Sequence, residues 1–128
     1  MQYEYFYGAQ AEQFSFYRIP KALFTEPNFR ELSTDAKVLY GILLDRMSLS
    51  LKNQWLDAQN KVYIIFTVEE IMDALNCANQ KATRLMVELE KQAGLIERKR
   101  QGLGRPNLIY VKNFAATIND KGCEKGDS

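Results

Sequence analysis

Apolar residues recur at steps of three and four between residues 36 and 47, and this period predicts an amphipathic helix with one buried face. The expected buried positions are Ala36, Leu39, Tyr40, Leu43, Leu44 and Met47. Ser33 precedes them with a hydroxyl group that suits an N-cap. Residues 48–60 are more polar, so we expect a loop there that Trp55 anchors on the core.

The next segment combines a strand pattern with a helix start. Residues 62–66 are β-branched and aromatic, which predicts a strand. Thr67 and Glu70 have the spacing of a capping box, in which each side chain binds the other residue's backbone N–H, and a short helix is expected over residues 68–75. Asn76 follows the last apolar residue and tolerates the left-handed conformation that ends a helix.

A longer helix and a hairpin complete the pattern. The helix is predicted over residues 79–92 and ends before Gly94. Two β-like runs, residues 95–100 and 108–111, flank residues 101–107, which are rich in Gly, Pro and Asn, and this arrangement is typical of a β-hairpin. The predicted order is helix, strand, helix, helix, strand, strand. This is the order of a winged helix–turn–helix, an α+β fold, over residues 29–114.

Residues 1–28, here called the aromatic arm, precede this unit. Residues 14–19 alternate in polarity and predict a short strand, and Pro20 opens a helical turn over residues 21–24. So much apolar surface on a short arm either folds back on its own subunit or contacts a second subunit, and both alternatives stay open. The candidate dimer contacts are Phe6, Tyr7, Phe14, Phe16, Tyr17, Leu23 and Phe24.

Bulk composition predicts a single cytoplasmic domain. The chain has 128 residues and is 46% hydrophobic, enough for a core of its own. No run approaches the ~20 apolar residues of a membrane span, and the N-terminus lacks the pattern of a signal peptide. Two cysteines fit the cytoplasm as reduced thiols. Residues 115–128 are polar and broken by glycine, so we expect a disordered tail or a linker.

Charge separates residues 77–112, here called the basic third, from the rest of the chain. This segment has eight Lys and Arg against three Glu, a net charge of +5, whereas the whole chain has 17 against 16, a net charge of +1. The remainder is therefore at −4. Exposed helices and hairpins also collect charge for solubility alone. Beside a helix–turn–helix pattern, however, the asymmetry favours a binding surface for a polyanion.

The helix over residues 79–92 has a polar face opposite its apolar one. Ala82, Leu85, Met86 and Leu89 are expected to be buried. The candidate DNA-binding residues are Asn79, Gln80, Lys81, Thr83 and Arg84. Amide side chains suit adenine and arginine suits guanine in the major groove, whereas Lys81 lies to the side and suits a phosphate. Ala78 is a weak N-cap, and Asn79 is the alternative.

The hairpin adds a second set of candidates, which are Arg98, Lys99, Arg100, Gln101 and Arg105. Because side chains alternate along a strand, Arg98 and Arg100 share a face and Lys99 opposes them. Arg105 lies before a proline at the tip, where it can enter the minor groove or bind a phosphate. Solvation of the outer sheet face is the competing interpretation for Lys99.

Enzymatic chemistry has few candidate residues. The chain has no histidine, which removes the commonest general base and metal ligand. Residues 102–104, Gly-Leu-Gly, lack the Lys-Ser/Thr of a phosphate-binding loop. The acidic residues of the helix over 68–75 complement its dipole. We therefore expect no catalytic residue, no cofactor and no metal.

Several segments share a pattern with one known family: residues 32–40, 45–50 with Asn53 and Trp55, 62–67, 94–96, the run Gln101-Gly102-x-Gly104-Arg105-Pro106, and 109–111. Together they resemble the N-terminal domain of the plasmid replication initiator protein A family of Gram-positive bacteria. The similarity spans about residues 3–114, and the two motifs D-R-M-S-L-S and Q-G-x-G-[KR]-P are not features of a generic winged helix. Gln54 stands where the family more often has Gly.

The resemblance implies a sequence-specific binder of double-stranded DNA at repeated sites, iterons, of a plasmid origin. It further implies a homodimer and host replication proteins as partners, recruited through a C-terminal region that this chain does not include. From the residues alone, a winged-helix transcriptional repressor and a winged helix used for protein–protein contact remain alternatives.

Overall fold

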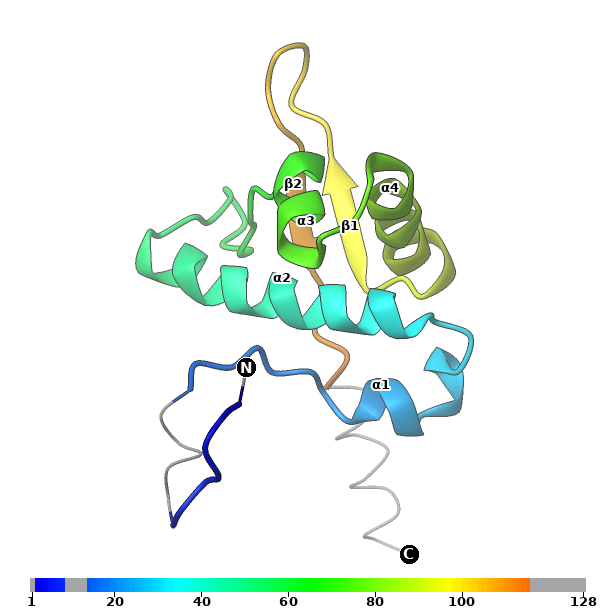
Figure 1. The fold of residues 1–128 in the computed structure, drawn as a ribbon. Coiled ribbons are helices and arrows are strands. Elements are labelled where there is room, and N and C mark those ends of the chain that lie inside the picture. Colours follow the sequence, from blue (N-terminus) through cyan, green and yellow to red (C-terminus); the bar gives the residue numbers. More distant parts are fainter. Residues whose placement is uncertain (1, 9–13, 116–128) are drawn as a thin grey trace, which may run out of the picture.

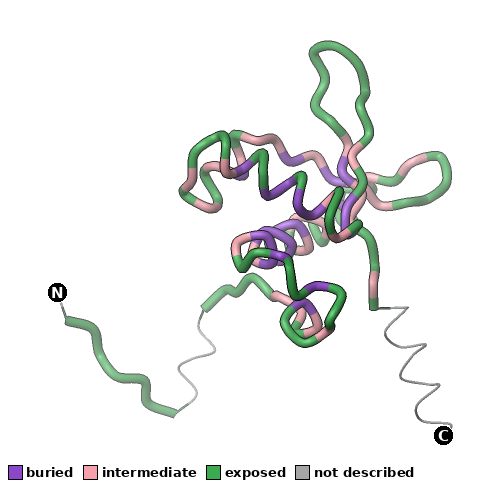
Figure 2. The backbone as a smooth tube through the Cα atoms, turned by 90° about the vertical axis from the view of Figure 1, so that its right-hand side faces the viewer, coloured by how far each residue is buried: buried purple, intermediate pink, exposed green. Residues whose placement is uncertain are grey.

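The computed structural model describes residues 2–8 and 14–115, so the expected disordered tail lies almost entirely outside the described part. A long helix, α2 (Thr34–Lys52), lies across the molecule beneath α3, α4 and a two-stranded hairpin (Figure 1). The short helices α1 (Ala22–Thr25) and η2 (Pro27–Phe29) lie on its other side. Buried residues gather between these layers, whereas residues 2–8 and the loop of the hairpin are exposed throughout (Figure 2).

Helix α2 begins as predicted and ends later than predicted. The Ser33 hydroxyl caps it by accepting a hydrogen bond from the Ala36 N–H at 3.1 Å. The predicted loop over residues 48–60 is wrong at its start, because the helix continues to Lys52. The Ser48 hydroxyl donates to the Asp45 carbonyl at 2.7 Å, so its polar group is satisfied inside the helix.

The predicted face of α2 forms the centre of the core. Ala36, Leu39, Tyr40 and Leu43 are buried, while Leu44 and Met47 are partly buried against them. The Tyr40 hydroxyl donates to the carbonyl of Lys112 at 2.8 Å, which ties α2 to the chain that leaves the hairpin. Burial raises the pKa of Tyr40 to about 12 because the phenolate would be poorly solvated there. Trp55 stacks on Tyr63 with a centroid distance of 6.3 Å and holds the following loop.

Helix α3 (Val68–Leu75) confirms the capping box. The Thr67 hydroxyl accepts from the Glu70 N–H at 3.2 Å, and the Glu70 carboxylate accepts from the Thr67 N–H at 3.1 Å. Asn76 ends the helix with φ 54° and ψ 50°, the left-handed conformation expected of it. These local signals set the length of α3 and the direction of the turn that follows.

Helix α4 (Asn79–Val87) continues without a break into the π-helical turn η3 (Glu88–Gln92), so the predicted span is correct but its last turn is wider than an α-helix. Ala78 is the N-cap residue and makes no side-chain cap hydrogen bond, so the alternative start at Asn79 is not adopted. The buried Glu88 carboxylate accepts hydrogen bonds from the backbone N–H and the hydroxyl of Ser33, the latter at 3.0 Å. The π-turn thus joins α4 to the start of α2.

The hairpin pairs β1 (Ile96–Lys99) with β2 (Leu108–Val111) in antiparallel register, from Ile96 opposite Val111 to Lys99 opposite Leu108. The prediction of a third strand over residues 62–66 is wrong. Only Ile64 bridges to β2, exchanging two hydrogen bonds of 2.9 Å with Ile109. The neighbouring Tyr63 N–H turns the other way and donates to the Trp55 carbonyl, so the segment divides its backbone bonds between the hairpin and the loop.

The aromatic arm is partly core and partly exposed. The predicted strand over residues 14–19 is wrong, because the described chain there pairs with no strand. It instead crosses α2 at Gly41, where an added Cβ would lie 2.8 Å from Cγ1 of Ile19. Leu23 on α1 is 0% exposed, so it is a core residue and is not available to a dimer contact. The other six candidates are 51–67% exposed: Phe6, Tyr7, Phe14, Phe16, Tyr17 and Phe24.

Candidate nucleic-acid interface

The loop of the hairpin projects away from α2 (Figure 1), and η3, the continuation of α4, packs against β1. The predicted buried face of this helix is confirmed: Ala82, Leu85, Met86 and Leu89 are all buried. The predicted polar positions Asn79, Gln80, Thr83 and Arg84 are all exposed. The Asn79 amide oxygen accepts a long hydrogen bond of 3.5 Å from the Thr83 hydroxyl one turn later. The surface therefore offers amide, hydroxyl and guanidinium groups within two helical turns.

Lys81 is placed differently from its neighbours. Its ammonium group lies 2.6 Å from the Asp35 carboxylate in the first turn of α2, and the two side chains are 42% and 50% exposed. The pair links the start of α4 to the start of α2. Because both groups are half-exposed, water screens their attraction and the pair is weak. The charge of Lys81 is nonetheless largely balanced at this surface.

The loop that joins β1 and β2, residues 100–107 and here called the hairpin loop, is held in a defined turn. The Gln101 side-chain amide donates to the Pro106 carbonyl at 2.8 Å, and the Arg105 N–H donates to the Gly102 carbonyl at 3.3 Å. Gln101 therefore shapes the loop from within. Arg100 and Arg105 are exposed, and like Lys99 beside them they have no ion-pair partner within the described residues.

Arg98 departs from its expected place. Its guanidinium donates two hydrogen bonds to one Glu90 oxygen, from Nε at 3.0 Å and from Nη2 at 2.8 Å. The second Glu90 oxygen accepts the Arg98 backbone N–H at 3.2 Å. The side chain therefore lies against η3, partly buried, and does not share an exposed face with Arg100. The side-chain hydrogen bonds from Arg98 are the main reason that the pKa of Glu90 lies below its ordinary value.

Sequence reasoning missed the carboxylates that position this surface. Glu90 precedes Arg98 by eight residues and Asp35 precedes Lys81 by 46, and neither spacing is a local motif. A third group, Asp57, accepts from the Lys61 and Gln59 N–H groups and from the Tyr110 hydroxyl on β2, the last at 3.1 Å. The hydrogen bond from Lys61 is the largest cause of the lowered pKa of Asp57.

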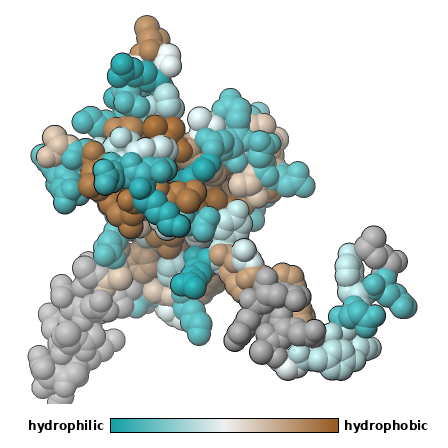
Figure 3. Space-filling view, turned by 90° about the vertical axis from the view of Figure 1, so that its left-hand side faces the viewer, coloured by the Kyte–Doolittle hydropathy of each residue, from teal (hydrophilic) through white to brown (hydrophobic). Residues whose placement is uncertain are grey.

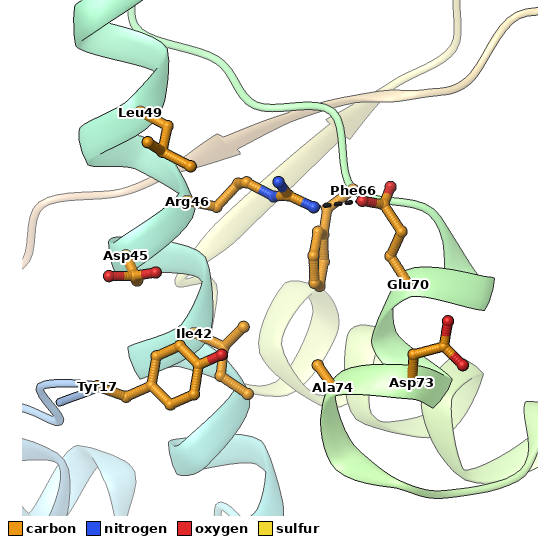
Figure 4. Close-up of a pocket in the computed structure, with 9 residues that line it drawn as sticks. All are labelled: Tyr17, Ile42, Asp45, Arg46, Leu49, Phe66, Glu70, Asp73 and Ala74. Carbon is orange, nitrogen blue, oxygen red and sulfur yellow. Dashed lines mark hydrogen bonds and ion pairs between the residues drawn. The ribbon is translucent and has the colours of Figure 1, made fainter. Parts of the chain in front are cut away.

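A shallow groove of about 400 Å³ lies between α2, α3 and the arm residue Tyr17 (Figure 4). Its central cation, Arg46, is paired with Glu70 and lies 4.8 Å from the centre of the Phe66 ring. Asp45 and Asp73 occupy its rim. Because Glu70 already balances the charge of Arg46, this ion pair mainly joins α2 to α3.

Within residues 2–8 and 14–115, no three His, Cys, Asp or Glu side chains are grouped so that they could hold a metal ion. No helix in the same ranges is long and apolar enough to cross a membrane.

Three solved structures are similar to this chain. A structure described as the N-terminal domain of a DNA binding protein is 36% identical, with a TM-score of 0.72 over 99% of this chain and 98% of that chain. A Rep-DNA complex gives the same identity and TM-score over 98% of both chains. A structure of an MDR initiator is 38% identical, with a TM-score of 0.67 over 93% of this chain and 98% of that chain. The domain is therefore of the α+β class found in these proteins.

Sequence similarity shows the family to which the chain belongs. The family described as the N-terminus of replication initiator protein A (RepA) matches residues 15–124, so the chain belongs to this family, as its motifs predicted. A 41 kDa protein from Lactobacillus helveticus is 32% identical over 103 residues, which cover 80% of this chain. The matched stretch is only 28% of that relative's length.

Proposed function

We propose that this domain is a winged helix–turn–helix that binds double-stranded DNA at repeated sites of a plasmid origin and so takes part in initiating replication. One observation carries the proposal: the polar positions at the start of α4 are exposed, as are hairpin cations that have no ion pair among the described residues, and η3 packs the continuation of α4 against this hairpin. Membership in an initiator family and likeness to a Rep-DNA complex support it. Recruitment of host replication proteins through a C-terminal region is a further part of the proposal, supported by the greater length of the relative.

Within this proposal, the two elements have different tasks. Gln80 and Arg84 on α4 read base edges in the major groove, with Asn79 and Thr83 beside them, because helix residues near the N-terminus reach furthest into the groove. Exposed cations of the hairpin contact phosphates and orient the domain. Lys81 contributes less than its charge suggests, since Asp35 balances it.

Salt dependence tests whether the surface binds DNA. Arg84, Lys99, Arg100 and Arg105 are exposed and have no ion-pair partner within the described residues. If most of them displace counterions from duplex DNA, log K should fall with log salt at a slope of about −3 to −4 per bound domain. The assay is a fluorescence titration with an origin duplex, beside a scrambled duplex of equal length. A slope near zero on both duplexes contradicts DNA binding.

Base preference tests the division of tasks between helix and hairpin. We expect Arg84→Ala and Gln80→Ala to change which sequences are selected from a randomised duplex library. Lys99→Ala should weaken all sequences to a similar degree, because a phosphate carries no base identity. A selected profile for Arg84→Ala that matches the parent profile removes Arg84 from the reading surface.

We further propose that the exposed part of the aromatic arm supports a homodimer. Eight of its large apolar side chains are more than half exposed, and Phe14 contacts both Phe6 and Phe16 edge to face. The test is sedimentation of the parent and of a variant with all three changed to Ser, which leaves the buried Leu23 intact. A parent that stays monomeric at micromolar concentration and on its DNA site excludes the dimer.

A further inference from the structure

Leu103, at the tip of the hairpin loop, is 102% exposed and is the most exposed large apolar side chain in the described part of the chain. Hydrophobic surface at the end of the projecting hairpin stands above hydrophilic surface in Figure 3. Single apolar residues on a surface are common, but they usually lie partly against their neighbours. This one touches too little of its own protein to contribute to folding.

The tip is built to present this side chain. Gly102 and Gly104 flank it with φ 118° and 78°, conformations that favour glycine, and neither has an atom within 4 Å of where a Cβ would stand. The Arg105 and Gln101 hydrogen bonds described above close the turn behind it. The result is a narrow tip with one apolar side chain and no side chain on either side.

The tip also has the direction and the charge of a groove-binding element. The tip projects beyond the helices (Figure 1), on the hairpin against which η3 packs the continuation of α4, so it is accessible to a duplex bound along that helix. The cations nearest in sequence, Arg100 and Arg105, are exposed and without an ion pair in the described part of the protein. The minor groove is ~6 Å wide, with deoxyribose carbons along its walls and phosphates at its edges.

We propose that the hairpin loop enters the minor groove with Leu103 leading, and that this side chain packs against the deoxyribose walls while Arg100 and Arg105 bind the flanking phosphates. Minor-groove proteins often present apolar side chains to the duplex, where some insert between base steps. The contact adds affinity without adding charge. The proposal rests on the DNA binding proposed above and names a contact that the polar candidates do not include.

The test compares Leu103→Ala with the parent on the duplex that the parent selects from a randomised library. We expect Leu103→Ala to bind about tenfold more weakly, because it loses three carbons that the groove would cover in part. The slope of log K against log salt should not change, since no cation is removed. Leu103→Met, similar in volume, should bind within about threefold of the parent.

Leu51→Ala is the matched control, because Leu51 is 58% exposed near the end of α2, in the other layer of the molecule. It should bind as the parent does. A hydroxyl-radical footprint, which reports access to deoxyribose along the minor groove, should lose protection at the hairpin position only in Leu103→Ala. The thermal midpoint of Leu103→Ala should equal that of the parent, because the side chain buries nothing on folding.

Each outcome separates this inference from the function on which it rests. A parent that binds no duplex overturns both. A parent that binds, with Leu103→Ala equal to it in affinity and footprint, overturns the Leu103 contact alone. A weaker Leu103→Ala with a reduced salt slope also overturns it, because the loss would then come from a displaced arginine.

Discussion

Replacing Arg98 with Ala tests whether this residue holds the hairpin or binds DNA. The change removes two charge-assisted hydrogen bonds of 3.0 and 2.8 Å to Glu90 and leaves that carboxylate with the backbone N–H alone. The two side chains are only 25% and 17% exposed, so solvent replaces the lost bonds incompletely. Hydrogen bonds to charged groups contribute about 1.5–3 kcal/mol, and we expect the free energy of unfolding to fall by about 2 kcal/mol.

Urea denaturation at pH 7 measures this loss, and the thermal midpoint should fall by roughly 8 °C for a domain of this size. Lys99→Ala is the matched control, because Lys99 is the next residue on β1, exposed and without an ion pair in the described chain. We expect its unfolding free energy to lie within about 0.5 kcal/mol of the parent's. On DNA the order should reverse: Lys99→Ala reduces the salt slope, and Arg98→Ala leaves it unchanged.

The pH dependence gives an independent signature of the same pair. Arg98 lowers the pKa of Glu90 in the folded state, so the ionised pair stabilises the fold fully at pH values above the ordinary pKa of a glutamate. That contribution is lost as the pH falls through the folded pKa. Removing Arg98 removes the main cause of the shift, so the stability of Arg98→Ala should depend less on pH in this acidic range than that of the parent.

A double-mutant cycle with Glu90→Gln completes the test. We expect the two changes to be non-additive by about 1 kcal/mol or more, because each breaks the same hydrogen bonds. Additive effects, combined with a salt slope that falls by ~0.9 in Arg98→Ala, would refute the structural role. Arg98 would then bind a phosphate, as its sequence position first indicated.

Three further changes test packing, backbone conformation and a loop carboxylate. Gly41→Ala should lower stability and speed proteolysis of the arm, because the added Cβ would lie 2.8 Å from Cγ1 of Ile19. This loss should outweigh the helix propensity of Ala, which normally favours a helix by about 1 kcal/mol over Gly. A higher thermal midpoint with an intact arm would contradict the contact. Gln54→Gly should raise the unfolding free energy by roughly 0.5 kcal/mol, since Gln54 has φ 59° and glycine adopts that conformation without strain; an unchanged urea midpoint would argue against strain there. Asp57→Asn should lower stability at pH 7 and make stability decline less in acid. The reason is that the folded pKa of Asp57 is depressed, so the contribution of this carboxylate to stability is lost as pH falls through that value. A dependence of stability on acid pH identical to the parent's would show that the Asp57 carboxylate does not contribute.

Local signals in the sequence predicted the features whose partners lie within four residues. The Ser33 cap, the Thr67–Glu70 capping box and the left-handed Asn76 all follow from such short-range bonds. The buried faces of α2 and α4 follow from a helical period, which one segment carries by itself. The exposure of the polar positions of α4 follows from the same period.

Features that depend on distant partners could not be predicted. The segment at residues 62–66 has a strand composition, but only Ile64 pairs with β2. The neighbouring Val62 and Tyr63 pair instead with residues of the loop that precedes them, Leu56 and Trp55. Leu23 looked like part of an exposed arm until α1 placed it in the core. Arg98 and Gln101 carry the residue types of DNA contacts, yet one is held by η3 and the other by its own loop.

The carboxylate partners of Lys81 and Arg98 reduce the number of cations in the basic third that are available to DNA. Of its eight cations, Lys81 pairs with Asp35 and joins α4 to α2, and Arg98 pairs with Glu90 and joins β1 to η3. A DNA phosphate that drew either cation away would leave Asp35 or Glu90 unpaired near a polyanion, which is unfavourable. The Arg98–Glu90 pair, the less exposed of the two, should therefore persist in a complex. The net +5 then acts in two ways: Arg98 holds the hairpin against η3, and the cations without an ion pair in the described part of the chain provide the salt-dependent affinity.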